Sequence, residues 1–127
     1  MKQVRNILII AITVMGFIAC QKDEGKAGVK GTWEGYWGFD LETPDVYERW
    51  EMKKNGDLEA YNSSDKLIAT GSWHVDGFNF EAEYTTVTSH NKYLFEGLYS
   101  DAAGELTGNW GHAPSSTNGG TFDMYRK

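Results

Sequence analysis

Apolar and polar residues alternate along the chain from residue 31 to the C-terminus, in short runs separated by Gly, Asn, Asp and Ser. A period of two is typical of β-strands that bury one face, and such breaks are typical of turns. No helical period is long enough to compete with this pattern. The runs predict an all-β fold with eight strands, at residues 31–40, 46–54, 58–62, 66–75, 78–85 and 92–100 and around residues 106–110 and 122–126.

Turn chemistry predicts how these strands are connected. Asn55-Gly56 and Asp76-Gly77 are strong signals for tight hairpins, and a longer loop at 112–119 precedes the last strand. Short connections between successive strands favour an up-and-down order, and closing such a sheet into a barrel removes its exposed edges. The sequence therefore predicts an eight-stranded antiparallel up-and-down barrel over residues 31–127.

The predicted inward faces are rich in aromatic residues. On the strand at 46–54, Val46, Trp50 and Met52 would share the inward face. The aromatic residues predicted to point inward are Trp33, Trp37, Trp50, Trp73, Phe78, Phe80, Tyr84, Phe95, Trp110 and Phe122. Each ring buries ~150–250 Å², so these rings are enough to fill a narrow barrel completely. Alternatively, some line a cup at one mouth, for which Trp37, Phe39 and Trp110 are the candidate ligand-binding residues.

A Gly-x-Trp pattern recurs at Gly31-Thr-Trp33, Gly71-Ser-Trp73 and Gly108-Asn-Trp110. Because an eight-stranded interior is only just wide enough for side chains, we interpret each Gly as the small neighbour that a large inward Trp needs. The pattern, the strand count and Arg126 resemble a lipocalin-like barrel of the calycin group. That resemblance implies that Gly31 and Trp33 open the first strand and that Arg126 packs over Trp33 where the barrel closes.

The N-terminus has the pattern of a bacterial lipoprotein. Lys2 and Arg5 precede an uncharged apolar run at 7–19, which is typical of a secretory signal and shorter than the roughly 20 residues of a membrane-spanning helix. Phe17-Ile18-Ala19-Cys20 resembles a lipobox, in which the cysteine is acylated, for example with palmitate, and becomes the first mature residue. We therefore expect a signal peptide at 1–19, then a lipidated Cys20 with a flexible tether at 20–30. The alternatives are an uncleaved anchor and a coincidental cysteine.

The residues after Cys20 point to a location. Gln21-Lys22-Asp23-Glu24 resembles the surface-export signal of Bacteroidota-type lipoproteins. The resemblance implies a chain held by its lipid on the bacterial outer membrane and facing the cell exterior. The alternative is a polar tether with no targeting role.

Charge and motifs argue against nucleic-acid binding and catalysis. Without the signal peptide, ten basic residues face eighteen acidic ones, a formal charge of −8, which repels nucleic acid. His74, His90 and His112 occur singly, without the spacing of metal ligands, and Glu81 with Glu83 fits the solvated face of a strand better than a catalytic pair. The sequence contains no nucleophile elbow and no phosphate-binding loop. We expect neither an enzyme nor a bound metal or cofactor.

Two functions stay open for this lipid-anchored barrel. In the first, it binds a small apolar or aromatic ligand at the barrel mouth, which the lipocalin resemblance and the five Trp residues favour. In the second, it is an accessory lipoprotein of an outer-membrane complex or an enzyme inhibitor, with a filled, ligand-free core and an acidic surface that contacts a protein. In both, Cys20 is the link to the membrane.

Substitution of Cys20 tests the lipid anchor. Cys20→Ala removes the thiol that would be acylated, so we expect a product that is uncleaved or unanchored. Separation of membrane and soluble fractions, with a mass measurement of the product, detects either result. Membrane fractionation that is unchanged by Cys20→Ala would contradict the lipoprotein prediction.

Overall fold

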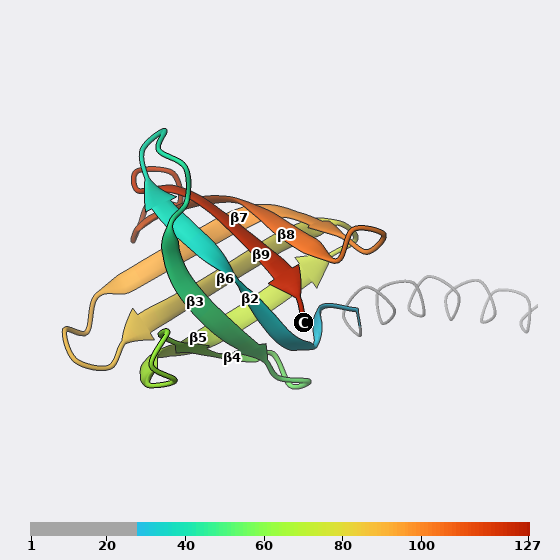
Figure 1. The fold of residues 1–127 in the computed structure, drawn as a ribbon, viewed down its shortest axis with the longest axis horizontal. Helices are drawn as coiled ribbons and strands as arrows, with labels where there is room; N and C mark the ends of the chain where they lie inside the picture. The colour runs from blue at the N-terminus through green and yellow to red at the C-terminus, as the bar shows by residue number, and fades with distance from the viewer. Residues whose placement is uncertain (1–27) are drawn as a thin grey trace, which may run out of the picture.

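The computed structural model describes residues 28–127, which form one closed barrel of eight antiparallel strands (Figure 1). The strands are β2 (Gly31–Phe39), β3 (Val46–Met52), β4 (Asp57–Tyr61), β5 (Leu67–Asp76), β6 (Asn79–Thr86), β7 (Lys92–Ser100), β8 (Glu105–His112) and β9 (Gly120–Arg126). This topology confirms the predicted all-β up-and-down barrel. The predictions for the signal peptide, Cys20 and residues 21–27 lie outside the described residues. Within the described part, no helix is long and apolar enough to cross a membrane.

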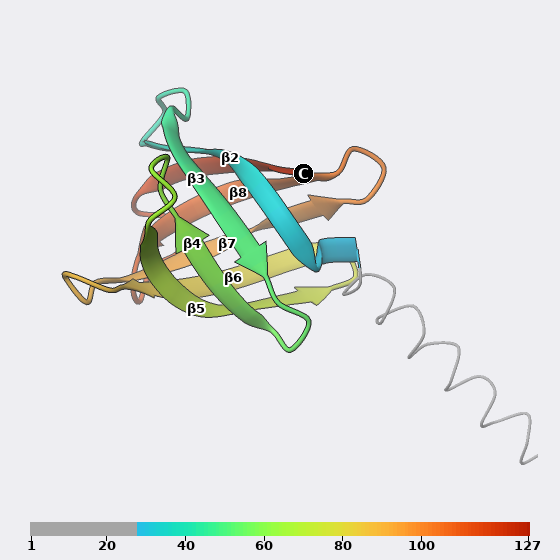
Figure 2. The ribbon, with the colours of Figure 1, turned by 60° about the horizontal axis from the view of Figure 1, so that its bottom comes forward.

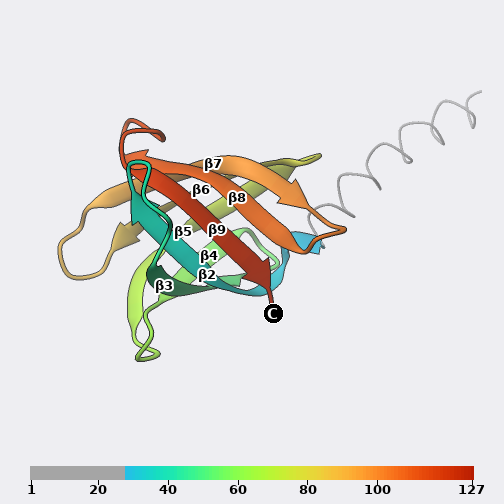
Figure 3. The ribbon, with the colours of Figure 1, turned by 45° about the horizontal axis from the view of Figure 1, so that its top comes forward.

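The barrel closes by the pairing of its first and last strands. Each strand pairs with its neighbours in sequence, and β9 also pairs with β2. The register of this closure runs from Trp33 opposite Arg126 to Phe39 opposite Gly120, and Figure 3 shows the two strands side by side. Every strand of the described sheet therefore has two neighbours, which removes the exposed edges that invite aggregation.

The two ends of the barrel are built from different connections. At the end that lies to the left in Figure 1 are the longer connections, residues 40–45, 62–66, 87–91 and 113–119, and we name this end the mouth. At the other end, which we name the closed end, are the connections 53–56, 77–78 and 101–104, together with the C-terminus. Strand β2 runs from the closed end to the mouth, so the described chain enters the barrel opposite the mouth.

Large apolar side chains fill the closed end. The buried core there includes Val29, Trp33, Met52, Leu58, Leu106 and Met124. The indole Nε1 of Trp33 donates to the Val29 carbonyl at 2.7 Å, which satisfies the polar atom of a fully buried ring. Val29, which precedes the first strand, thus belongs to the core of the barrel.

Arg126 covers Trp33 from the last strand. Its guanidinium carbon lies 5.3 Å from the centroid of the Trp33 ring and 5.8 Å from that of Tyr99. Its Nη2 donates to the Tyr99 hydroxyl at 2.8 Å and to the Gly28 carbonyl at 3.2 Å, and it pairs with Asp101 at 3.2 Å. One side chain thus joins β9, the connection at 101–104 and the residues before β2, and it seals this end of the barrel.

The glycines of the Gly-x-Trp pattern act on the backbone. Gly31 has a φ of +128°, which strains any residue with a side chain, and nothing described lies within 4 Å of the place that a Cβ would take. At Gly71 a Cβ would lie 1.8 Å from the Glu83 carbonyl oxygen of the neighbouring strand. These glycines therefore permit a backbone angle or a close approach of strands. At Gly71 and Gly108 the nearest atoms belong to the backbone of the neighbouring strand and not to a Trp ring.

Two hairpins differ in detail from their predictions. Asp76 is the last paired residue of β5, so Gly77 and Phe78 form the two-residue loop before β6. Phe78 is consequently 67% exposed, and its predicted inward position is wrong. The turn at Asn55-Gly56 is a four-residue connection, 53–56, in which only Gly56 has a positive φ.

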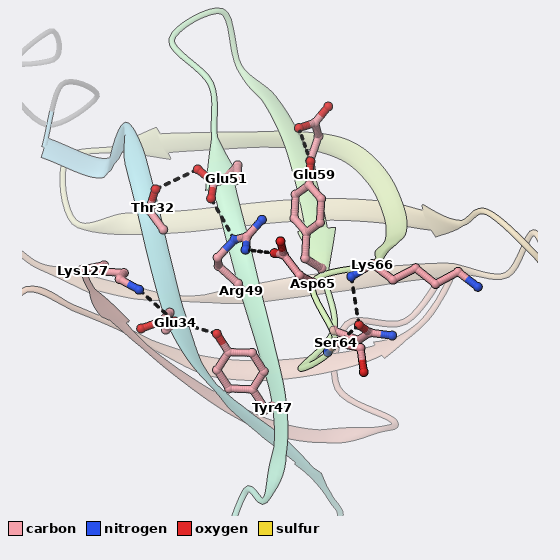
Figure 4. A network of polar contacts seen from close by, with 12 residues as sticks. Thr32, Glu34, Tyr47, Arg49, Glu51, Glu59, Ser64, Asp65, Lys66 and Lys127 are labelled. Carbon is pink, nitrogen blue, oxygen red and sulfur yellow. Dashed lines mark hydrogen bonds and ion pairs between the residues drawn. The ribbon is translucent and has the colours of Figure 1, made fainter.

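Polar side chains cover the outside of β2, β3 and β4, which lie side by side in Figure 2. Arg49 is the centre of a network there (Figure 4), with its Nε 2.9 Å from Glu51 and its Nη1 paired with Asp65. The Tyr47 hydroxyl donates to Glu34 at 2.6 Å in the same network. The alternation of these strands thus places most of their charged groups on the outside of the barrel.

Truncation of Trp33 tests the packing of the closed end. Because its ring is fully buried and hydrogen-bonded, Trp33→Ala should lower the free energy of unfolding by ~3–5 kcal/mol, a large share of the total for so small a domain. Tyr36→Ala, on the exposed face of the same strand, is the matched control and should lower it much less. Urea denaturation followed by circular dichroism measures both values. An unchanged unfolding midpoint for Trp33→Ala would refute its role in the core.

Candidate functional site

The three residues predicted to line a ligand site lie together at the mouth. The ring centroids of Trp37 and Phe39, both on β2, are 5.2 Å apart. The Trp110 ring, on β8, lies 5.0 Å from Trp37 and 5.6 Å from Phe39. All three pairs meet edge to face, the favoured geometry for aromatic rings. The fold thus assembles one ring cluster from two strands that are not adjacent in the sheet.

The rings of this cluster differ in how firmly they are held. The Trp110 Nε1 donates to the Gly38 carbonyl at 2.9 Å, and its buried ring packs against Gly119, where a Cβ would lie 2.5 Å from the ring. Phe39 is 50% exposed at the end of β2. The mouth therefore has one fixed wall and one ring in contact with solvent.

A cavity of about 210 Å³ lies beside this cluster. Its lining is mainly apolar and consists of Trp37, Phe39, Glu48, Ile68, Tyr84, Thr86, Tyr93, Phe95, Trp110 and His112. The interior is therefore packed at the closed end and hollow at the mouth. The structure combines the two arrangements that the sequence left open.

Glu48 of β3 lies on the lining of this cavity and is only 3% exposed. Its Oε1 accepts a hydrogen bond from the Trp50 Nε1 at 2.9 Å, and its Oε2 accepts one from the Trp37 Nε1 at 2.8 Å. The Tyr84 hydroxyl lies 3.1 Å from Oε1 and 3.0 Å from Oε2. Neutral donors from β2, β3 and β6 thus converge on one buried carboxyl group.

The donors around Glu48 favour its ionised form, and its burial opposes that form. Indole N–H groups can only donate, so Trp37 and Trp50 suit a carboxylate, which only accepts. Burial is the largest effect and raises the pKa of the Glu48 carboxyl above its ordinary value, while the hydrogen bonds from Trp50, Tyr84 and Trp37 act to lower that pKa. Burial and the Glu48 charge raise the pKa of the Tyr84 hydroxyl well above its usual range, so this hydroxyl keeps its proton.

Sequence analysis missed Glu48, although the signal for it was present. Glu48 has the same parity as Trp50 and Met52, so the alternation of β3 already places it on the inward face. Val46, which was predicted to share that face, is partly exposed at the edge of the mouth. A charged residue that the alternation places on the inward face, two positions before an inward Trp, indicates a polar group inside the barrel.

Tyr93 and His112 complete the mouth. Their ring centroids are 4.9 Å apart, and the His112 ring lies 5.7 Å from that of Trp110. The sequence predicted His112 as the first residue of a loop, but His112 is the last residue of β8. Because His112 pairs with Tyr93 of β7, its imidazole lies at the edge of the cavity.

A second hollow lies outside the barrel, over β5, β6 and β7. It has a volume of about 340 Å³, and its lining includes His74, Glu81, Glu83 and Glu96. It is more polar and more open to solvent than the mouth cavity. Among residues 28–127, no three His, Cys, Asp or Glu side chains lie close enough together to hold a metal ion. The mouth cavity is the better candidate, because ligand pockets are concave and mostly apolar with a few placed polar groups.

Comparisons of the chain with protein-family models, curated proteins and solved structures find no match. The lipocalin-like resemblance therefore stays a prediction carried by Gly31, Trp33 and Arg126. The candidate site stands on its own geometry.

The raised pKa of Glu48 predicts how stability depends on pH. In the unfolded chain this carboxyl loses its proton near pH 4.5, whereas in the folded protein it does so at a higher pH. Between these two values the folded state binds more protons than the unfolded state, so the free energy of unfolding falls as the pH rises. Glu48→Gln cannot titrate at this position, so its free energy of unfolding should lack that fall, apart from a constant offset.

Urea denaturation of both proteins between about pH 4 and pH 8 measures this difference. The pKa of Glu34 is lowered by a hydrogen bond from Tyr47, and the pKa of Asp101 by one from Tyr99. These two groups titrate in both proteins, so their effects cancel in the comparison. Curves that stay parallel over the whole range would show that burial does not raise the Glu48 pKa.

Proposed function

We propose that this barrel is a binding protein that takes a small ligand, with an aromatic or apolar part, into the cavity at its mouth. The observation that carries the proposal is the cavity of about 210 Å³, walled by Trp37, Phe39, Tyr93 and Trp110, with Glu48 on its lining. An apolar concavity with a few placed polar groups is the common form of a ligand site, and the mouths of β-barrels are among its usual places.

The size of the cavity limits the ligand. Pockets for drug-sized molecules are ~300–1,000 Å³, and this one is smaller. A single ring or a short hydrocarbon chain matches the volume. The surrounding indole and phenol rings offer such a group edge or face contacts, which add ~0.5–1.5 kcal/mol for each aromatic pair.

The proposal includes an exported, lipid-anchored chain held by Cys20 on the bacterial outer membrane and facing the cell exterior. The signal pattern at 1–19, the lipobox and Gln21-Lys22-Asp23-Glu24 support it. The direction of β2 also supports it, because β2 begins at the closed end and leads to the mouth. A barrel held through its N-terminal segment would present its mouth away from the membrane.

A second candidate is that the mouth contacts a protein, as an accessory lipoprotein or an enzyme inhibitor would. Leu41 is 100% exposed, and Phe39 and Val46 flank the same connection between β2 and β3 with partly exposed side chains. Exposed apolar groups that lie together are typical of interaction surfaces. We define these three residues as the apolar rim.

Saturable binding of one-ring compounds tests the proposed function. We expect 2-phenylethanol to quench the Trp fluorescence with saturation, because Trp37 and Trp110 line the cavity. Phe39→Ala should weaken this binding about 2- to 10-fold, the equivalent of one aromatic contact. Phe78→Ala is the matched control, because it removes an exposed ring at the closed end and should leave binding unchanged.

Two results would count against this proposal. Equal weakening by Phe39→Ala and Phe78→Ala would show that the ligand does not lie at the mouth. If no compound in a broad panel of one-ring alcohols, amines and acids binds with saturation, the small-ligand proposal fails and the apolar rim becomes the better candidate.

A further inference from the structure

Glu48 is not explained by the packing of the barrel. Among the residues that the structure describes, it is the one charged side chain that is buried. None of the ion pairs formed within residues 28–127 involves it. Burial of an acid without a cation is unfavourable, and an apolar residue of similar size would remove that penalty.

The hydrogen-bonding capacity of Glu48 is not exhausted by its neighbours. An ionised carboxylate accepts about four hydrogen bonds. Trp37, Trp50 and Tyr84 each have one hydrogen to donate to it, although the Tyr84 hydroxyl lies within reach of both oxygens. In the ionised form, one acceptor position and the negative charge are left, on a side chain that lines the cavity.

The walls of the cavity suit a positive charge for a second reason. The face of an aromatic ring is electronegative and attracts a cation within about 6 Å of its centroid. Trp37, Tyr84, Tyr93 and Trp110 line the cavity together with Glu48. Aromatic rings around a carboxylate can bind an organic cation. The charged group of the cation then lies near the carboxylate, and its hydrocarbon part packs against the rings.

The charges around the mouth have the sign that attracts such a ligand. Residues 28–127 contain eight Lys and Arg against sixteen Asp and Glu, a formal charge of −8. The connection at 40–45 carries Asp40, Glu42 and Asp45 and no basic residue. The Lys and Arg residues on or next to the other mouth connections are Lys66 and Lys92, and Lys92 is held in an ion pair. This distribution favours the approach of a cation and opposes that of an anion.

We propose that the ligand of the mouth cavity is a small organic ammonium ion, an aromatic or alkyl amine whose charged nitrogen contacts Glu48. The inference rests on the proposed function, the binding of a small ligand at the mouth. A hard metal ion does not fit, because Ca²⁺ and Mg²⁺ take about six or more oxygen ligands and the lining offers one carboxylate among rings.

Three probes that share a phenyl ring and differ in charge test this inference on the full chain. They are 2-phenylethylammonium, 2-phenylethanol and phenylacetate, titrated by calorimetry at about pH 7.5, where an alkylamine is cationic. We expect the Kd of the ammonium probe to be at least about tenfold below that of the alcohol, because of its charge-assisted contact with Glu48. Phenylacetate should bind more weakly than the alcohol, because the carboxylate repels it.

A pair of variants assigns the preference to Glu48. Glu48→Gln keeps the shape of the side chain and removes its charge, so the preference for the ammonium probe over the alcohol should fall below about threefold. Glu81→Gln, on the exposed outer face of β6, changes the net charge by the same amount and should keep the full preference. Circular dichroism establishes that each variant is folded.

The outcomes separate this inference from the proposed function. If the alcohol binds as tightly as the ammonium probe, the ammonium inference is overturned and small-ligand binding stands. If none of the three probes binds, the ammonium inference is overturned, and the broad panel of one-ring compounds decides the proposed function. A preference that persists in Glu48→Gln also overturns the inference, and if that variant does not fold, the ratio of the probes on the unaltered chain decides.

Discussion

The narrow interior of an eight-stranded barrel constrains everything else in this molecule. Such an interior is only just wide enough for side chains, so each large ring in it excludes another. At the closed end, Trp33 and the apolar residues of the core take the space, and Arg126 covers the opening. At the mouth, Trp37, Phe39 and Trp110 meet edge to face and leave a cavity beside them. The fold thus separates a part that maintains stability from a part that is open to binding.

Glu48 joins these two parts through its hydrogen bonds. Its donors come from β2, β3 and β6, so a single carboxyl group connects strands that are not all neighbours in the sheet. A buried hydrogen-bond network selects one arrangement of the interior, because other arrangements leave more of its polar groups unpaired. A buried charge with a perturbed pKa is nevertheless a poor source of stability and is common at functional sites. The barrel holds this unfavourable group on the lining of the mouth cavity.

The fold was predictable from the sequence, and the candidate site only in part. Alternation and short connections were enough for eight strands and closure, because burial of one face leaves a period of two. Trp37, Phe39 and Trp110 were placed at the mouth because they lie near strand ends. Glu48 was missed, because the inward face of a strand is identified by its apolar residues. A charged residue at an inward position does not fit that pattern. Phe78 was misplaced, because the hairpin loop consists of Gly77 and Phe78, so the ring lies in an exposed loop and not on strand β6.

Sealing one end of the barrel has a consequence for the kinetics of exchange. Val29, Trp33 and the Arg126 side chain close the end opposite the mouth, so a bound molecule enters and leaves by the same opening. A ligand of the proposed kind would reach Glu48 past the rings that line the mouth, among them Phe39, which is 50% exposed. For such a ligand, the motion of the rings at the opening would limit the rate of release, whereas the contact with Glu48 would contribute to the affinity. A barrel of this kind can change its rate of release and its strength of binding through different residues.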